Sequence, residues 1–388
     1  MFTFSQQNLQ QKGTIYTATE IAGQPEIWER TMNNFFLEKP QLEQFLQCVY
    51  KEVDNIVLTG AGTSAFIGLS LQGCFSRNTG IITRAIATTD IVSHPGDYFN
   101  HHQTPFIISF ARSGNSPESY AALELAEKFS KKCFHLIITC DNNGALANFK
   151  TEQPHYIFVL PEAANDKSLA MTSSYSGMLL TGLLTAYIQQ PEKCKEQVEL
   201  LITAAENILD NYSNELQQLA KKNFKRAVFL GSGNLFGTAT EAALKLQELT
   251  DGRVICKADT YLGLRHGPKA VIDNNTLVVY FFSNDHYVYQ YEKDLVESME
   301  QNNALCQIGV SENAVDGVGL DTQINYGNGK DKIMEDFLPV CAIISGQLLG
   351  FYKSLEFGLM PDTPSTNGSI SRVVQGVKIY PFEKMFNK

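Results

Sequence analysis

Short apolar runs that alternate with helical stretches are the feature that most limits the fold of this sequence. In the first half, such runs lie at 55–59, 81–87, 105–110, 134–139 and 155–160. Their residues are apolar at successive positions, which indicates strands covered on both faces of a parallel sheet. Helical stretches are expected at 64–76, 117–132, 144–150 and 170–190. Strands alternating with helices predict an α/β fold with a parallel sheet.

The same pattern returns after residue 222, so the chain reads as two copies of one α/β unit. The segments IVLTGAGTS (56–64) and VFLGSGN (228–234) each combine a strand, a glycine turn and the start of a helix. Strands near 277–282 and 304–310, with helices near 286–302 and 334–357, complete the second copy. The repeat length is far longer than that of a solenoid, so two domains in tandem are expected.

We predict an N-terminal helical arm at 1–50, a first domain at 51–195, a connecting helix at 196–222 and a second domain at 223–388. Pro25 and Pro40 are expected to break the helix of the arm. The connecting segment repeats apolar residues at three- and four-residue spacing. A tail at the end of the second domain, 361–382, is rich in turn formers and is expected to wrap back over the body.

Composition excludes several classes of protein. The net charge of −10 argues against a nucleic-acid binder, which would present a basic face. The eight cysteines form no C-x-x-C pair, so neither a zinc site nor a disulfide framework is indicated. The N-terminus lacks the pattern of a signal peptide, and the apolar run 178–188 is too short to cross a bilayer. We expect a cytoplasmic protein without a metal.

Two loops between a strand and a helix are candidate anion sites. In Gly60–Ser64, Thr63 and Ser64 offer hydroxyls at a helix N-terminus, although an ordinary strand–helix turn explains such a loop equally well. In the segment 109–119 (SFARSGNSPES), Arg112, Ser113 and Ser116 supply a guanidinium and hydroxyls suited to a phosphate. The alternative is that Ser116 only caps the helix and Arg112 only forms a surface ion pair.

A third Ser/Thr cluster, with Thr172 and Ser173, begins the helix expected at 170–190. Loops at the carboxyl ends of neighbouring parallel strands converge where open α/β sheets bind their ligands. The three clusters together therefore predict a phosphorylated small molecule as the ligand.

The helix EAALKLQE (241–248) places Glu241, Lys245 and Glu248 on one face. A surface ion pair between Glu241 and Lys245 is the simpler interpretation, and an acid–base site is the alternative. Glu248 lies ~20 Å along the helix from the glycine turn at 231–234, at ~1.5 Å per residue. We therefore expect Glu248 to face the phosphate loops of the first half.

The motifs GAGTS (60–64), SFARSGNSPES (109–119), EAALKLQE (241–248) and RHGPKAVID (265–273) resemble the sugar isomerase (SIS) domain family. Their order is similar to that of C-G-T-S, S-Q-S-G-E-T, E-G-A-L-K-L-K-E and K-H-G-P in the isomerase half of glucosamine-6-phosphate synthase. The resemblance covers roughly residues 35–375 and is greatest to the AgaS-type members. It implies two flavodoxin-like three-layer domains and a homodimer with its active site at the subunit interface.

The resemblance also assigns roles to individual residues. Thr63, Ser64, Ser113 and Ser116 match the phosphate loops. Glu248 matches the glutamate that moves a proton between C1 and C2, and Lys245 a lysine beside it. His266 matches the histidine that assists ring opening from the neighbouring subunit. No cofactor is implied.

Two departures from the family pattern bear on the reaction. Ala111-Arg112 replaces Ser-Gln, which suggests a direct contact between Arg112 and the phosphate. The C-terminal lysine that forms an imine in the synthase has no match in 367–374, where Arg372 is the nearest base. A substrate that carries its own nitrogen forms an imine without that lysine.

The resemblance and these departures together favour a deaminase/isomerase that converts galactosamine 6-phosphate into tagatose 6-phosphate and ammonia. The alternatives are a ketose–aldose isomerase, a deglycase of 6-phosphorylated Amadori compounds, and a non-catalytic sugar-phosphate sensor. The presence of both Glu248 and His266 argues against the sensor, which would need only the phosphate loops.

Overall fold

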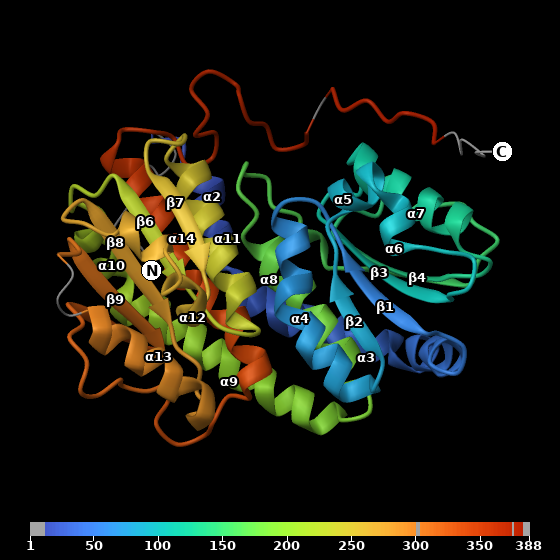
Figure 1. The fold of residues 1–388 in the computed structure, drawn as a ribbon, viewed down its shortest axis with the longest axis horizontal. Coiled ribbons are helices and arrows are strands. Elements are labelled where there is room, and N and C mark those ends of the chain that lie inside the picture. The colour runs from blue at the N-terminus through green and yellow to red at the C-terminus, as the bar shows by residue number, and fades with distance from the viewer. Residues whose placement is uncertain (1–11, 300–302, 375, 383–388) are drawn as a thin grey trace.

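The computed structural model describes residues 12–299, 303–374 and 376–382, and within them the chain forms two five-stranded parallel sheets side by side (Figure 1). The first sheet has the order β2-β1-β3-β4-β5 and the second β10-β9-β8-β6-β7. Counted from the first strand of each half, both orders are 2-1-3-4-5, the flavodoxin-like order. The predicted α/β class and the predicted duplication are both confirmed.

The elements of the first half and of the connecting helix are α2 (Ile15–Ala22), α3 (Gln24–Val49), β1 (Asn55–Thr59), α4 (Thr63–Thr79), β2 (Ile82–Ala85), α5 (Thr88–Ser93), α6 (Pro95–Tyr98), β3 (Pro105–Ala111), α7 (Pro117–Phe129), β4 (Phe134–Thr139), β5 (His155–Val159), η1 (Glu162–Ala164), α8 (Ser173–Ala186), α9 (Pro191–Asn207), η2 (Ile208–Tyr212) and α10 (Ser213–Ala220). The elements of the second half are β6 (Arg226–Leu230), α11 (Leu235–Leu249), β7 (Ile255–Asp259), α12 (Tyr261–Leu264), η3 (Pro268–Val271), β8 (Thr276–Phe281), α13 (His286–Met299), β9 (Cys306–Ser311), β10 (Thr322–Asn325), η4 (Glu335–Phe337) and α14 (Leu338–Glu356).

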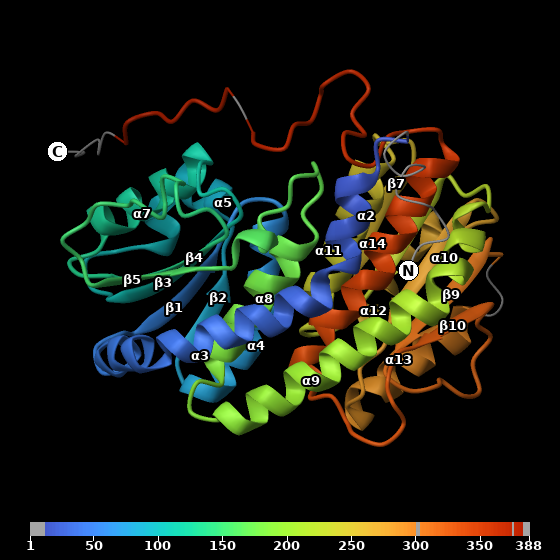
Figure 2. The same cartoon turned by 180° about the vertical axis from the view of Figure 1, so that it is seen from behind.

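Each sheet is the middle layer of three. The outer face of the first sheet packs against α5 and α7, and the outer face of the second against α12 and α13. One large apolar core fills the space between the sheets and takes in side chains of α3, α4, α8, α9, α11 and α14 (Figure 2). The central strands β3, β4, β8 and β9 are buried along their whole length, as their continuous apolar runs predict.

Helices α4 and α11 cross closely between the two halves. A Cβ atom at Gly237 of α11 would lie 2.2 Å from Ser70 Oγ and 2.6 Å from the carbonyl oxygen of Phe66, both on α4. No larger residue fits there, so this glycine permits the close approach. The crossing brings the C-terminal half of α11 against the start of α4, where the first candidate anion loop lies.

The structure corrects several local predictions in the first half. Pro40 lies inside α3 and does not end it; the break falls at Gly23, and Pro25 occupies the first turn of α3. The buried side chains of α3, among them Trp28 and Leu42, hold the helix together across the missing N–H of Pro40. The expected helix at 144–150 is a series of turns, in which the side-chain amide of Asn148 donates to the carbonyl of Gly144.

Two edge strands of the second sheet, β7 and β10, were not predicted. Their sequences, ICKAD and TQIN, are partly exposed and carry polar residues, so they lack the apolar run of a buried strand. The connecting segment is helical as expected, from α9 through the π-helical turn η2 to α10. The exact domain boundaries stay a prediction.

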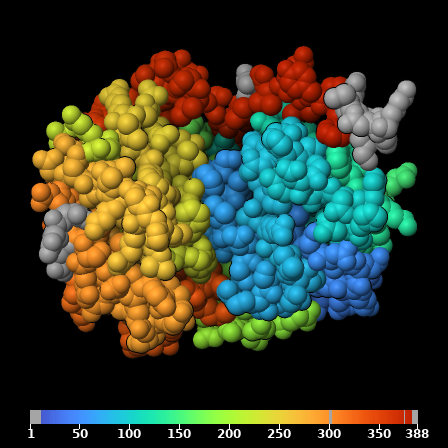
Figure 3. All heavy atoms as spheres, in the orientation of Figure 1, coloured from blue at the N-terminus to red at the C-terminus, as the bar shows by residue number. Residues whose placement is uncertain are grey.

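Helix α14 is the central helix of the second half. The segment Glu335–Glu356 is long and apolar enough to cross a membrane by length and composition, but 94% of its apolar window is buried inside the protein. After this helix the tail leaves the second half and runs along the edge of both halves, so it does wrap back over the body (Figure 3).

Candidate active site

A cavity of about 570 Å³ opens at the carboxyl ends of β1 and β3. This is the point where the strand order of the first sheet reverses, and open α/β sheets bind ligands there. The walls come from five segments of the chain: the loop at 61–64, the loop at 110–119, residues 169 and 171 before α8, the C-terminal half of α11, and the tail at 368–374. The two predicted anion loops and the charged face of α11 therefore meet at one place.

The first loop is shaped by two glycines. A Cβ at Gly60 would lie 2.6 Å from the Cβ of Ser64, so only glycine permits so tight a turn. Gly62 has φ +55°, a conformation that side chains disfavour. The turn places Thr63 and Ser64 at the N-terminus of α4, where backbone N–H groups and the helix dipole favour an anion.

The second loop leads from β3 into α7. Ser116 is the N-cap and Pro117 the first helical residue, as predicted, but no side chain caps this helix N-terminus. The hydroxyl of Ser116 donates instead to Oε2 of Glu118 at 2.7 Å. Ser113 accepts from the N–H of Asn115 at 3.3 Å, which leaves its own hydroxyl proton available. The uncapped start of α7 thus offers donors to the cavity.

Arg112 lines the cavity but is already engaged by the backbone. Its Nη1 donates to the carbonyls of Ser168 (3.3 Å) and Leu169 (3.1 Å), and its Nη2 donates to the carbonyl of Arg372. The guanidinium has five N–H donors, so these bonds do not exhaust it. Arg112 therefore joins the second loop to the segment before α8 and to the tail, and keeps donors for a phosphate.

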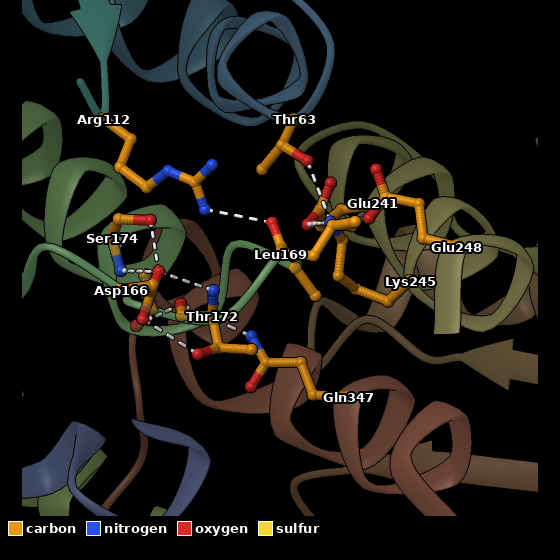
Figure 4. Close-up of polar contacts among 12 residues, drawn as sticks. Thr63, Arg112, Asp166, Leu169, Thr172, Ser174, Glu241, Lys245, Glu248 and Gln347 are labelled. Carbon is orange, nitrogen blue, oxygen red and sulfur yellow. Dashed lines mark hydrogen bonds and ion pairs between the residues drawn. The ribbon is translucent and has the colours of Figure 1, made fainter. Parts of the chain in front are cut away.

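The charged face of α11 forms a row whose centre is Lys245 (Figure 4). Its ammonium lies 2.5 Å from Glu248 Oε2, 3.3 Å from Glu241 Oε1 and 3.1 Å from the hydroxyl oxygen of Thr63 on α4. The side chains of Lys245 and Glu241 are 1% and 0% exposed, whereas that of Glu248 is 23% exposed. The interpretation as a surface ion pair is wrong, because the close packing of α4 on α11 buries the pair.

Burial and the neighbouring charges together set the pKa values of Glu241 and Lys245 in this row. Burial raises the pKa of the Glu241 carboxyl to about 8; the charge of Lys245 opposes the shift and that of Glu248 adds to it. Burial works against the charge of Lys245, but attraction to Glu241 and Glu248 outweighs it and raises the pKa of the ammonium. Lys245 therefore stays protonated beside Glu248, and Glu248 is the member of the row that reaches the cavity.

The third Ser/Thr cluster lies outside the cavity, which corrects the predicted phosphate contacts of Thr172 and Ser173. Both residues are buried at the N-terminus of α8, where the carboxylate of Asp166 accepts their backbone N–H groups and that of Ser174. The hydroxyl of Thr172 also donates to Asp166, and that of Ser173 to the carbonyl of Glu20. An internal carboxylate thus holds the position of an anion at this helix (Figure 4).

The tail completes the cavity wall. Arg372 does not point a free base at the site, because its guanidinium donates to the carbonyl of Asp166 (2.8 Å from Nε) and to Oδ1 of Asn165 (2.7 Å from Nη2). Arg112 in turn donates to the carbonyl of Arg372. These contacts anchor the segment 368–374 over the opening.

His266 is not part of the cavity of its own chain. It follows α12 at the surface of the second half and is exposed, and its backbone N–H donates to the carbonyl of Gly263 at 3.0 Å. The cavity-lining residues do not include it. Its predicted role stays a prediction that requires a second chain.

One group of side chains away from the cavity has donor atoms close enough to share a metal ion, within the residues that the structure describes. Glu127, Cys133 and His135 already contact one another, with His135 Nε2 3.2 Å from Glu127 Oε1 and 3.3 Å from Cys133 Sγ. His135 Nδ1 has no partner, whereas a metal-bound histidine normally donates from its second nitrogen. We interpret the group as a hydrogen-bonded network of the core.

Sequence reasoning missed Glu118, Asp166 and the extent of the tail. Glu118 lines the cavity two residues after Ser116, and its carboxylate was the available signal. Asp166 lies in a loop without a recognisable motif, so nothing in the sequence marked it as the cap of α8.

Comparison with known proteins agrees with the fold. The SIS domain family matches residues 50–187. A D-galactosamine-6-phosphate deaminase AgaS from Shewanella sp. (strain ANA-3) is 38% identical over 98% of this chain and 95% of its own length.

Solved and more distant proteins extend the likeness. A crystal structure described as a tagatose-6-phosphate ketose/aldose isomerase, from Clostridium novyi NT, superimposes with a TM-score of 0.93 at 39% identity and covers 98% of both chains. The glutamine–fructose-6-phosphate aminotransferase of Oceanobacillus iheyensis is 24% identical over 91% of this chain and 58% of its own length.

Proposed function

This chain belongs to the AgaS family of SIS-domain proteins, and from that premise we propose that it is an amino-sugar-phosphate deaminase/isomerase. Its substrate is D-galactosamine 6-phosphate and its products are D-tagatose 6-phosphate and ammonia. The observation that carries the proposal is the meeting of Glu248 with the hydroxyl-rich loops at 61–64 and 110–119 in one cavity. A sugar phosphate anchored in these loops presents its first carbons to the α11 side of the cavity.

The residues of the cavity divide the work. Thr63, Ser64, Ser113 and Ser116, with the N-termini of α4 and α7, hold the phosphate. Glu248 removes the proton from C2 of the open-chain sugar and returns a proton to C1, as a positioned general base and acid. The aldehyde oxygen gains a proton, and the amine becomes an imine at C2. Water then adds to the imine carbon and ammonia leaves, so the net reaction consumes one water.

Lys245 argues against a reaction in which a lysine of the chain forms an imine with a ketose. Lys245 is the one lysine among the described residues that line the cavity. Its ammonium lies between Glu241 and Glu248, and the pKa of Lys245 is raised. A protonated amine cannot attack a carbonyl, so Lys245 is unsuited to form an imine with a ketose. An amino sugar supplies its own nitrogen and needs no such lysine.

The experiment that tests this function measures the ammonia released from galactosamine 6-phosphate and glucosamine 6-phosphate, and the lysine released from fructosyl-lysine 6-phosphate. We expect release from galactosamine 6-phosphate at the highest kcat/KM. Turnover of the Amadori compound alone would favour the deglycase. Binding of every phosphate without turnover would favour the sensor.

The protein acts as a homodimer in this proposal, with His266 of one subunit opening the sugar ring in the cavity of the other. Two observations support it: His266 is exposed, and it lies outside the cavity of its own chain.

The eight cysteines are all unpaired, which suits a reducing cytoplasm.

A mixing experiment tests the shared site. Glu248→Gln and His266→Ala are each expected to be nearly inactive alone. Subunit exchange between them creates one cavity with both native residues, so activity returns. If each subunit carried a complete site, the mixture would stay inactive.

A further inference from the structure

Next to Lys245 and Glu248 lies the buried carboxyl group of Glu241, which the proposed mechanism does not use. Glu241 precedes Lys245 by one turn of α11, and both side chains are shielded from solvent. The Lys245 ammonium has three N–H donors. The oxygens around it are those of Thr63 at 3.1 Å, Glu248 at 2.5 Å and Glu241 at 3.3 Å. The contacts with Thr63 and Glu248 are hydrogen bonds, and Glu241 lies at ion-pair distance from the same ammonium.

The carboxyl group of Glu241 makes few polar contacts with its surroundings. Neither of its carboxyl oxygens has a hydrogen-bond partner in the part of the chain that the structure describes, and Lys245 is its charged neighbour. A buried carboxylate without donors is costly. Because two carboxyl groups face one ammonium, the lowest cost is reached when one of them stays neutral. Glu248 reaches the solvent-filled cavity, so Glu241 is the neutral member.

We propose that Glu241 is a positioning residue for the reaction: as a neutral acid, its carbonyl oxygen holds the Lys245 ammonium from below and so fixes the Glu248 carboxylate at the cavity wall. The inference rests on the proposed function, because Glu248 is the group whose position it explains. Helices α4 and α11 pack closely at Gly237, and the side chains of Lys245 and Glu241 are buried. Glu241 touches no substrate and acts through its neighbours.

The charges around Glu241 support a neutral acid at neutral pH. Burial raises the pKa of Glu241 to about 8 against the opposing charge of Lys245. Tyr175 of α8 is the titratable group that faces it from another helix, and burial raises the pKa of that phenol far above the working range. Above a pH of about 8, ionised Glu241 competes with Glu248 for the ammonium, and the Glu248 carboxylate loses its fixed position.

Two substitutions at Glu241 separate the effect of its acceptor oxygen from the effect of its ionisation. Glu241→Gln keeps an oxygen that accepts from Lys245 but cannot ionise. Glu241→Met keeps the volume and removes the acceptor. The matched controls are Glu292→Gln and Glu292→Met, because Glu292 is also fully buried and has a raised pKa of about 8, yet lies in the second half outside the cavity.

We expect Glu241→Met to lower kcat for ammonia release by about 10- to 100-fold, the loss typical of a displaced catalytic group, with KM nearly unchanged. Glu241→Gln should keep kcat within about threefold at pH 7 and should lack the fall in activity that we expect of the native protein above a pH of about 8. Both controls should keep the native kcat and pH profile.

Three results would overturn the inference. One is a native kcat in folded Glu241→Met; another is an equal loss in Glu241→Gln and Glu241→Met at pH 7; the third is a native alkaline limb in Glu241→Gln. Should Glu241→Met not fold, the pH profile of Glu241→Gln still decides the question. Failure of the proposed function is distinct, because the native protein would then release no ammonia.

Discussion

The two halves of this chain share one strand order but treat the carboxyl end of the sheet differently. In the first half, the loop after β3 leaves α7 uncapped and faces a cavity of about 570 Å³. In the second half, the loop after β8 borders a smaller cavity of about 300 Å³, and carboxyl groups of the chain itself accept backbone N–H groups of this loop and of α13. Glu292 accepts the N–H of Ser283 at 2.8 Å, and Asp285 accepts the N–H groups of Tyr287 and Val288 at the start of α13.

The contrast shows why one helix N-terminus can bind a ligand while another only stabilises the fold. A helix N-terminus at the end of a parallel strand attracts an anion by geometry alone. Where the chain supplies its own carboxylate, as at α13 and α8, that attraction contributes to stability. At α7 the acidic residue of the first turn, Glu118, accepts from the hydroxyl of Ser116, and the backbone donors of the helix start remain for a ligand. The second half instead contributes α11, whose acid–base row faces the cavity of the first.

Among the substitutions that test this difference between the two halves, Glu248→Gln has the largest expected effect. The substitution keeps the shape of the side chain and removes the base, so we expect kcat to fall by about 10²- to 10⁴-fold. Binding of inorganic phosphate, measured by calorimetry, should be unchanged because the loops of the first half are intact. Equal turnover in the variant would remove Glu248 from the reaction.

The second prediction concerns buried carboxyl groups and pH. Glu292 and Glu20 have pKa values raised to about 8 and about 7, the main cause being burial. The unfolded chain releases these protons near the ordinary value of 4.5, whereas the folded chain retains them. Stability contributed by protonation is therefore full below that value and is lost as pH rises toward 8.

Thermal unfolding between pH 5 and 8 measures this effect. The free energy of unfolding should fall with rising pH, by on the order of a few kcal/mol for Glu292. Glu292→Gln should flatten the slope without changing KM. A slope that is identical in the variant would show that Glu292 does not titrate between these pH values.

Ser116→Ala tests the anion site of the first half. The hydroxyl is lost from the start of α7, so we expect KM for the sugar phosphate to rise by about tenfold, since a hydrogen bond to a charged group contributes ~1.5 kcal/mol or more. The kcat should change little, because the acid–base row is untouched. An unchanged KM would mean that the phosphate binds elsewhere.

The matching change in the second half has the smallest expected effect. Asp285→Ala removes the side chain that accepts from the first turn of α13, and loss of such a cap costs about 1 kcal/mol of stability. KM and kcat should stay native. A rise in KM equal to that of Ser116→Ala would erase the contrast between the halves.

Sequence patterns predicted the central strands of both sheets and the edge strands β2 and β5 of the first, but missed two edge strands of the second. The strands β3 and β8 are mainly apolar and buried throughout, and both were predicted, while the edge strands β7 and β10 carry polar residues and were missed. The helix face with Lys245 was recognised from its spacing. Its burial was not, because that depends on the crossing of α4 and α11 at Gly237.

The site shows the same limit. Serine and glycine loops after strands predicted the cavity residues Thr63, Ser64, Ser113 and Ser116. Thr172 and Ser173 have an equally suggestive sequence, yet Asp166 takes the anion position at their helix. The loop that carries Asp166 folds back on α8 through tertiary contacts, so spacing along the chain could not reveal the competition.

One measurement tests the central claim directly: the fate of deuterium placed at C2 of galactosamine 6-phosphate. If Glu248 abstracts that hydrogen in the cavity between the halves, ammonia release by the native protein will be slowed by the label. The deuterium will then appear at C1 of tagatose 6-phosphate or in water. Ammonia released with the deuterium still at C2, or no ammonia at all, would contradict the account.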